Sequence, residues 1–354
     1  MPSQSSVDVA HDDLEPSSVA SNIPLDVLDV IFASLLPQDL AVCCRVSKAV
    51  SSIAVDALYR HVQPTPRNIL HLCLKLCNEP NLARRVRSFK IHANVDMYLG
   101  VISDALPKLV RLDTLVLNIG PSSSWVLPSG DACPFLLRTF MCTFQYDAPL
   151  ISFLNGQQDL LYLTIPSSNA LRLTVPKLMM PKLVSICAPL ALVEALVPGR
   201  PVYEVSTVSN QGQNGPSISC LSKSTNSLGV LRLMVNYRYL ESIGCEILAL
   251  AAPNLLTLTL DLDHIKPDDD EMLDDLIEYM EEYLSYAKSL GRLIIRFYPS
   301  LSRIPCQELD FSDMITSIFA ASVKLRFVVI AFFGFKAKYV CERLPGHDWY
   351  IVND

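Results

Sequence analysis

The sequence predicts an α/β protein in which a small all-helical module precedes a long domain of short parallel strands and helices. Three observations support this prediction. Residues 24–62 carry apolar side chains at helical spacing, interrupted by Pro37. From Leu109 to Ile330, leucines recur in a loose Leu-x-x-Leu-x-Leu pattern. Of the 354 residues, 50% are hydrophobic and 18% are charged, which allows a large core.

The first 20 residues are serine-rich and acidic, and we expect a disordered tail rather than a signal peptide. The eleven cysteines form no Cys-x-x-Cys pair. This pattern predicts free thiols in a reducing compartment, cytoplasmic and/or nuclear. Because no run of about 20 uncharged apolar residues occurs, we also expect no membrane-spanning segment.

The helical module is predicted over residues 21–65. Pro24 can open a helix, because a residue in the first turn needs no amide hydrogen. Pro37 starts a second helix with Asp39 in its first turn, where the helix dipole favours negative charge. Val27 and Val30 widen the apolar stripe of the first helix to a second side. So short a unit cannot bury two apolar faces alone, and we expect a partner to cover one of them. The main stripe consists of Leu25, Leu28, Ile31, Phe32, Leu35 and Leu36.

These features occur in a characteristic order over residues 23–50: Ile23-Pro24-Leu25-Asp26, an aliphatic helix, Pro37-Gln38-Asp39-Leu40, and Val46-Ser47-Lys48. This order resembles the F-box, the helical module that binds the Skp adaptor of a ubiquitin ligase. Ile23 and Asp26 replace the family's usual leucine and glutamate, and Val50 stands where a tryptophan is common. An ordinary amphipathic helical hairpin is the alternative. The resemblance implies that the adaptor contacts Ile23, Pro24, Leu25, Leu28, Ile31, Phe32, Leu35, Pro37, Leu40, Val46 and Val50.

The long domain, residues 66–354, is predicted from the leucine pattern. Its units start at residues 109, 160, 183, 228, 255, 290 and 325, and weaker strands near Phe140 and Val205 would complete the series. The pattern and spacing resemble the leucine-rich repeat. Alternating leucines on short strands become buried when neighbouring strands stack in parallel. Because the units are irregular, we expect a degenerate leucine-rich-repeat solenoid. A non-repetitive α/β domain remains the alternative.

Other segments complete the predicted domain. Helices are expected over Tyr98–Leu106, Leu190–Leu196, Tyr239–Ala252 and Asp269–Leu290. Residues 204–227 are rich in Ser, Asn, Gln and Gly, and we expect an exposed loop there.

The sequence offers no motif for catalysis, a cofactor or a metal. It has no Gly-x-Ser-x-Gly, no glycine-rich phosphate loop and no His-Glu-x-x-His. Cys73 and Cys77 near His71 lack a second ligand pair for zinc. The acidic segment 261–271 has Lys266 where a calcium loop needs glycine, so we expect it to begin a helix. A net charge of −7 argues against nucleic acid as the main partner.

The resemblance and the leucine pattern together predict a substrate-recognition subunit of an SCF-type ubiquitin ligase. Such a subunit is not an enzyme. It binds the Skp adaptor, and through it the cullin scaffold, and it holds a protein substrate that the sequence does not name. The alternative is a leucine-rich interaction protein that acts without a ubiquitin ligase. Strand parity predicts that the open face of the solenoid contacts the substrate through Asn118, Arg232, Met234, Asn236, Asp261 and Arg296.

Overall fold

The computed structural model describes most of the chain in ten segments. These are residues 24–92, 96–166, 179–208, 218–236, 240, 242–263, 270–298, 311–332, 338–344 and 348–351. The chain divides into two compact units, Met1–His61 and Val62–Asp354.

The first unit contains three helices, α1 (Leu25–Ala33), α2 (Pro37–Cys43) and α3 (Lys48–Arg60). Proline occupies the first turn of α2, and the side chain of Ser47 caps α3 by accepting a hydrogen bond from the amide of Val50 at 3.3 Å. Arg60 at the end of α3 forms an ion pair of 2.9 Å with Asp29 on α1. The helices pack around a small buried core of Phe32, Leu40 and Ala54.

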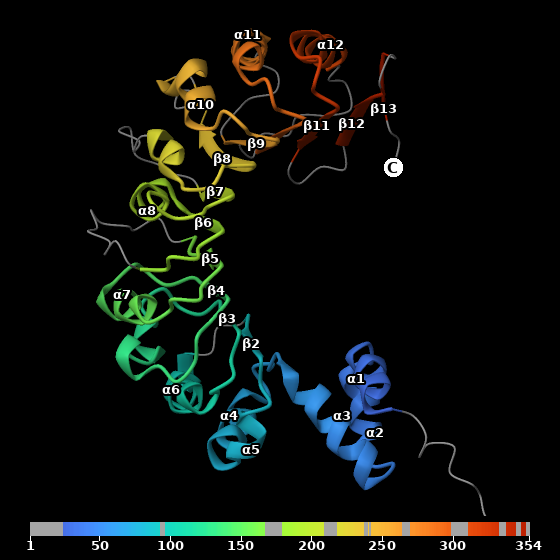
Figure 1. Cartoon of the computed structure of the whole chain (residues 1–354), viewed down its shortest axis with the longest axis vertical. Coiled ribbons are helices and arrows are strands. Elements are labelled where there is room, and N and C mark those ends of the chain that lie inside the picture. Colours follow the sequence, from blue (N-terminus) through green and yellow to red (C-terminus); the bar gives the residue numbers. More distant parts are fainter. Residues whose placement is uncertain are drawn as a thin grey trace, which may run out of the picture. The chain divides into compact units, whose positions relative to one another are not determined.

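The strands form one sheet whose order follows the chain from β1 to β13 (Figure 1). From β2 to β11 each strand pairs in parallel with the next, and β12 and β13 are antiparallel. The predicted α/β class is therefore confirmed. The strands are β1 (His61–Val62), β2 (Ser88–Ile91), β3 (Thr114–Leu117), β4 (Thr139–Cys142), β5 (Tyr162–Thr164), β6 (Ser185–Pro189), β7 (Glu204–Val208), β8 (Val230–Asn236), β9 (Thr257–Asp263), β10 (Arg292–Tyr298), β11 (Phe327–Phe332), β12 (Lys338–Arg343) and β13 (Trp349–Ile351).

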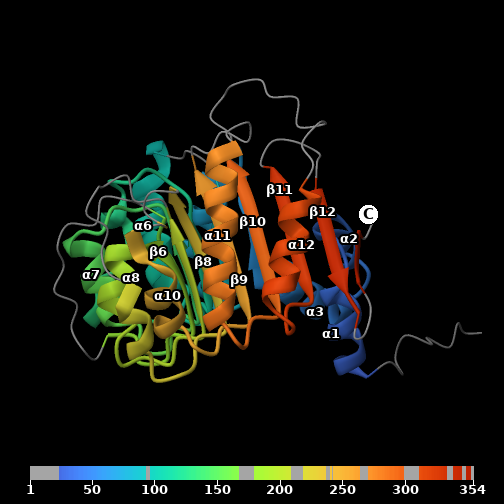
Figure 2. The same cartoon turned by 90° about the horizontal axis from the view of Figure 1, so that it is seen from above.

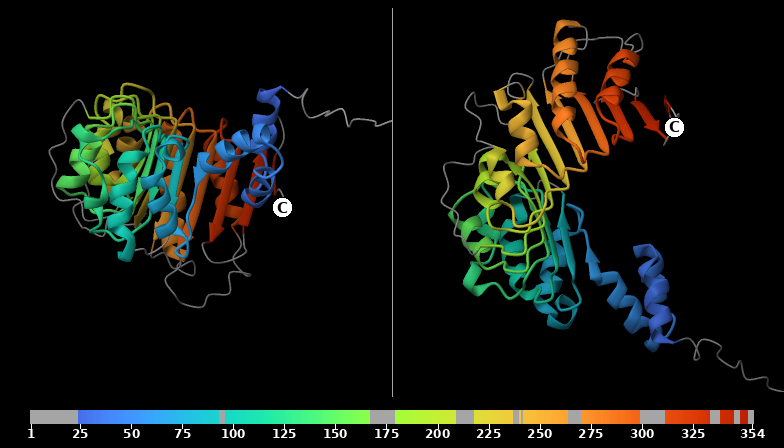
Figure 3. Two further views of the ribbon diagram at one scale, coloured as in Figure 1. Left: turned by 90° about the horizontal axis from the view of Figure 1, so that it is seen from below. Right: turned by 45° about the horizontal axis from the view of Figure 1, so that its top comes forward.

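The described helices of the second unit lie along one face of this sheet (Figures 1 and 3). Figure 2 shows α11 and α12 in front of neighbouring strands. The α-helices are α4 (Ile69–Asn78), α5 (Pro80–Ala83), α6 (Leu99–Ala105), α7 (Ala148–Asn155), α8 (Leu190–Leu196), α10 (Cys245–Ala251), α11 (Asp270–Tyr286) and α12 (Ser312–Ala321). Short 3-10 helices are η2 (Asp96–Tyr98), η3 (Leu106–Lys108), η4 (Ser124–Val126), η5 (Gly130–Ala132) and η6 (Ile218–Lys223).

One buried side chain from each of eleven adjacent strands forms a continuous line under the helices. We call this line the inner row. Strand register places its members side by side, and each is at most 1% exposed. The row runs through Phe89, Leu115, Phe140, Leu163, Ile186, Val205, Leu231, Leu258, Leu293, Val328 and Cys341.

The predicted strands near Phe140 and Val205 are confirmed as β4 and β7. The predicted loop over residues 204–227 is wrong at both of its ends, because β7 occupies its start and η6 its end. The polar composition of the segment suggested a loop. The alternation of side chains along a strand is nevertheless enough to bury Val205 and Thr207. Residues 209–217 lie outside the described segments.

The expected helices are present, and all but one have shifted ends. The predicted helix Leu190–Leu196 is α8 with the same bounds. Of the helix expected over Tyr239–Ala252, α10 begins only after Gly244, whose φ of 72° suits glycine and interrupts a helix. Of the helix expected over Asp269–Leu290, α11 ends already at Tyr286. The chain then turns toward β10, and the amide of Leu290 donates to the carbonyl of Ala287 at 3.3 Å in this turn.

Replacement of Leu258 by alanine tests the inner row. Leu258 is fully buried between Leu231 and Leu293, so Leu258→Ala should lower the free energy of unfolding by about 2–5 kcal/mol. Leu256, two residues earlier, is 49% exposed, and Leu256→Ala should cost less than about 0.5 kcal/mol. Thermal unfolding of both variants checks this difference. Equal losses of stability would contradict the inner row as the main source of stability.

Candidate functional site

The first unit exposes large apolar side chains on its surface. Their exposed fractions range from 43% for Ile31 to 73% for Val30. Val27, Val30 and Ile31 are three and four residues apart on α1, which places them on one side of the helix. We call the whole set the N-terminal apolar surface; its members are Val27, Val30, Ile31, Leu36, Val42 and Val46.

The residues predicted to contact an adaptor fall into two groups in the structure. Phe32 and Leu40 are buried in the core of the unit, and Leu28, Leu35 and Val50 pack against that core. The other described members of the set are exposed: Pro24, Ile31, Pro37 and Val46. Ile23 and the side chain of Leu25 lie outside the described residues.

Sequence reasoning therefore combined core and surface in one set, and it left Val27, Val30, Leu36 and Val42 out of the predicted contacts. Val27 and Val30 were visible in the sequence as the second side of the stripe, whereas Ile31 was assigned to its main side. Which side faces inward is decided by the packing of α1 against α3, which the sequence of α1 alone does not show.

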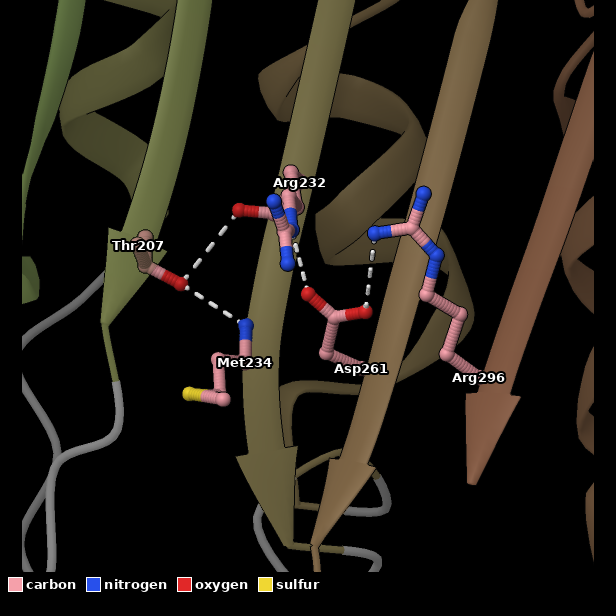
Figure 4. Close-up of polar contacts among 5 residues, drawn as sticks. All are labelled: Thr207, Arg232, Met234, Asp261 and Arg296. Atoms are coloured by element: carbon pink, nitrogen blue, oxygen red, sulfur yellow. Dashed lines mark hydrogen bonds and ion pairs between the residues drawn. The ribbon is translucent and has the colours of Figure 1, made fainter. Parts of the chain in front are cut away.

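On the face of the sheet that carries no helix among the described residues, three charged side chains meet (Figure 4). We call this face the open face. Asp261 on β9 is fully buried. Arg232 on β8 donates from Nε to Asp261 Oδ2, and Arg296 Nη1 on β10 lies 3.7 Å from Asp261 Oδ1. Two guanidinium groups thus share one carboxylate, which leaves an excess of positive charge at this position.

Thr207 on β7 fixes the position of this group. Its hydroxyl donates to the carbonyl of Arg232 at 3.4 Å and accepts from the amide of Met234 at 3.0 Å (Figure 4). The backbone pairing of β7 and β8 extends to Ser206 and Arg232, so the side chain continues the pairing beyond it.

The arginines remain partly accessible while the acid does not. The side chains of Arg232 and Arg296 are 41% and 36% exposed. Burial lowers the pKa of Arg232, but the hydrogen bond and charge of Asp261, with a smaller contribution from Tyr298, outweigh it and raise the pKa above its ordinary value. The buried carboxylate of Asp261 thus holds Arg232 by a charged hydrogen bond and Arg296 by an ion pair.

The structure changes the role predicted for Asp261. Strand parity predicted that Asp261 lies on the open face, and the register of the sheet places it beside Met234 and Arg296. Asp261 is fully buried between the two arginines, so it positions them and offers no exposed surface to a partner.

The remaining predicted residues of the open face are spread over the sheet. Met234 is half-buried beside the charged group. Asn118 follows β3, far from β9 in the strand order, and its Nδ2 lies 3.0 Å from His92 Nδ1. Asn236 belongs to β8, and its side chain lies outside the described residues.

The cysteines of the described segments are free, and several are buried. Burial raises the pKa of the thiols of Cys73, Cys142, Cys220 and Cys245 to about 12. A thiol with so high a pKa is a poor nucleophile at neutral pH. In the described part of the chain, no group of three His, Cys, Asp or Glu residues could hold a metal ion. None of the described helices is long and apolar enough to span a membrane.

No family model and no curated protein matches the chain. Its function therefore has to be inferred from its own residues.

A double-mutant cycle tests the pairing of Arg232 with Asp261. Arg232→Met alone leaves a buried carboxylate without its hydrogen bond and should lower the free energy of unfolding by about 1–3 kcal/mol. In the Asp261→Leu background the same change should cost much less, because no buried charge is then left behind. Denaturant unfolding of the four chains gives the coupling. The same cost in both backgrounds would contradict the pairing.

Alkylation tests the burial of the thiols. At pH 8 the raised pKa and the burial of Cys73 and Cys142 should protect both from iodoacetamide in the folded chain. Cys43 and Cys44 are only partly buried and should react first. Mass spectrometry of peptides from the native and the urea-unfolded chain measures the order. Labelling of Cys142 in the native chain as fast as Cys43 would contradict the structure.

Proposed function

We propose that the chain is the substrate-recognition subunit of an SCF-type ubiquitin ligase. In this proposal α1, α2 and α3 are an F-box that binds the Skp adaptor and, through it, the cullin scaffold. The second unit is a degenerate leucine-rich-repeat solenoid that holds a protein substrate. The chain binds and positions, and other subunits carry out ubiquitin transfer in the cytoplasm and/or nucleus.

The observation that carries the proposal is the N-terminal apolar surface. The buried core of the first unit consists of only three side chains among the described residues, whereas six large apolar side chains are exposed. Burial of apolar surface contributes about 25 cal/mol per Å², so a partner that covers these side chains would gain substantial binding energy. An apolar surface on a small helical unit is what an adaptor-binding module requires.

The arrangement of the second unit supports the solenoid. The parallel strands follow one another in chain order, each next to its sequence neighbour, and the helices lie on one face. Each strand from β2 to β12 supplies one member of the inner row, so neighbouring strands with their helices bury a common core that none could bury alone. This geometry leaves the open face for a substrate, where Arg232, Met234 and Arg296 are partly accessible.

Adaptor binding can be tested with matched double variants. Val30→Asp with Ile31→Asp places two charges on the N-terminal apolar surface, at side chains that are 73% and 43% exposed. This variant should lose co-purification with the Skp adaptor and keep its melting temperature, because neither side chain belongs to the core of the unit. The control is Ile247→Asp with Leu250→Asp on α10, where the exposed fractions are 50% and 66%.

The control variant adds the same charges at similar exposure and should retain the adaptor. Equal adaptor recovery by both variants would contradict an F-box at α1, as would failure of the unmodified chain to bind the adaptor. Either result would favour a leucine-rich interaction protein that acts without a ubiquitin ligase.

A further inference from the structure

A cavity of about 670 Å³ lies at the edge of the second unit, where the chain enters β10 and β11 and leaves β12. Its wall is formed by Ser289 and Gly291 before β10, residues 323–326 before β11, and Arg343 with Leu344 at the end of β12. These residues belong neither to the first unit nor to the charged group at Asp261.

The cavity concentrates positive charge. Lys324, Arg326 and Arg343 line it, and no acidic side chain does. Among the described residues, no carboxylate forms an ion pair with any of the three. An anion that enters the cavity is therefore attracted by three cations that form no ion pair with a described carboxylate.

Two of these cationic residues are neighbours in the backbone, where the chain enters β11 and leaves β12. The amide of Arg343 donates to the carbonyl of Arg326 at 2.9 Å, so the residues are direct neighbours across the antiparallel pair of β11 and β12. The backbone pairing therefore brings two cationic residues to the same part of the cavity wall.

Arg343 is held rigidly in the wall. Its Nη1 donates to the carbonyl of Ser322 at 3.0 Å, its Nη2 donates to the carbonyl of Phe319, and its guanidinium lies 4.6 Å from the ring centroid of Phe319. Burial lowers the pKa of Arg343, and the charge of Asp348 acts in the opposite direction. The cation is thus positioned in advance, which reduces the entropy that a ligand must give up on binding.

The cavity also offers an apolar contact. Val323 is 90% exposed and Leu344 is 43% exposed, and both line the same space as the cations. The volume lies within the range of about 300–1,000 Å³ that is typical of ligand pockets, and it exceeds what a single inorganic anion fills. A matching ligand therefore combines several negative charges with an aliphatic group.

We propose that this cavity binds an acidic segment of a partner protein, with carboxylates against Lys324, Arg326 and Arg343 and an aliphatic side chain against Val323 and Leu344. An extended peptide carries both kinds of group at short intervals. The site is independent of the ubiquitin-ligase proposal, since it uses different residues and a different ligand.

The test uses the full chain and two short fluorescent peptides, one of alternating glutamate and leucine and a twin with glutamine in place of glutamate. Fluorescence anisotropy should show binding of the glutamate peptide and at least about tenfold weaker binding of the twin. Lys324→Gln with Arg326→Gln should weaken binding of the glutamate peptide by about tenfold or more, because both side chains are exposed cations of the wall. Val323→Ser should weaken it several-fold.

The matched control is Lys108→Gln with Arg111→Gln, which removes two exposed cations beside the turn that precedes β3. This variant has the same net charge as the cavity variant and should change the affinity less than about twofold. Melting temperatures of all variants establish that they are folded. No binding of the glutamate peptide by the unmodified chain would overturn the proposal, as would equal weakening by the control. Binding of a phosphoserine peptide but not of the glutamate peptide would overturn the carboxylate assignment.

Discussion

No strand of the second unit can bury its own apolar side chains, and the rest of its structure follows from this constraint. Each member of the inner row, such as Leu231 or Leu258, is covered by its neighbours on the adjacent strands and by helices on one face. The stability of the second unit must therefore come from contacts between its neighbouring strands and the helices that cover them. At the end of the inner row, β12 and β13 return antiparallel. Trp349 on β13 stacks on Phe319 with ring centroids 6.3 Å apart, which covers this end of the row.

The first unit faces the same constraint without a row of neighbours. Its helices enclose Phe32, Leu40 and Ala54, and Val30 and Val46 remain in solvent. In the second unit, an apolar strand gains its partner from the next segment of the same chain. The described helices of the first unit supply no further apolar layer to cover these side chains. The two units thus differ in how much of their apolar surface their own described residues bury.

The elements that sequence reasoning predicted well are those set by local periodicity. Leu115 and Leu258 lie at the alternate positions of strands, and even the weak signals at Phe140 and Val205 correspond to strands. Features that depend on several segments were missed. The pairing of Asp261 requires arginines from both neighbouring strands, and the backbone contact of Arg326 with Arg343 requires the antiparallel return of β12. Neither contact can be read from the sequence of a single strand and its helix.

Among the described residues of the second unit, some arginines are paired with a carboxylate and others are not, and the two groups should differ in their attraction for an added anion. On the open face, the carboxylate of Asp261 already neutralises part of the charge of Arg232 and Arg296, so these arginines gain less from a further anion. At the edge cavity, Arg326 and Arg343 are neighbours in the backbone, and no ion pair among the described residues holds either of them. An anion there gains from attraction to both cations. On the open face, the fixed positions of Arg232 and Arg296 favour contacts that depend on geometry. Binding of an anion at the edge cavity depends mainly on charge, so added salt should weaken it more than binding on the open face.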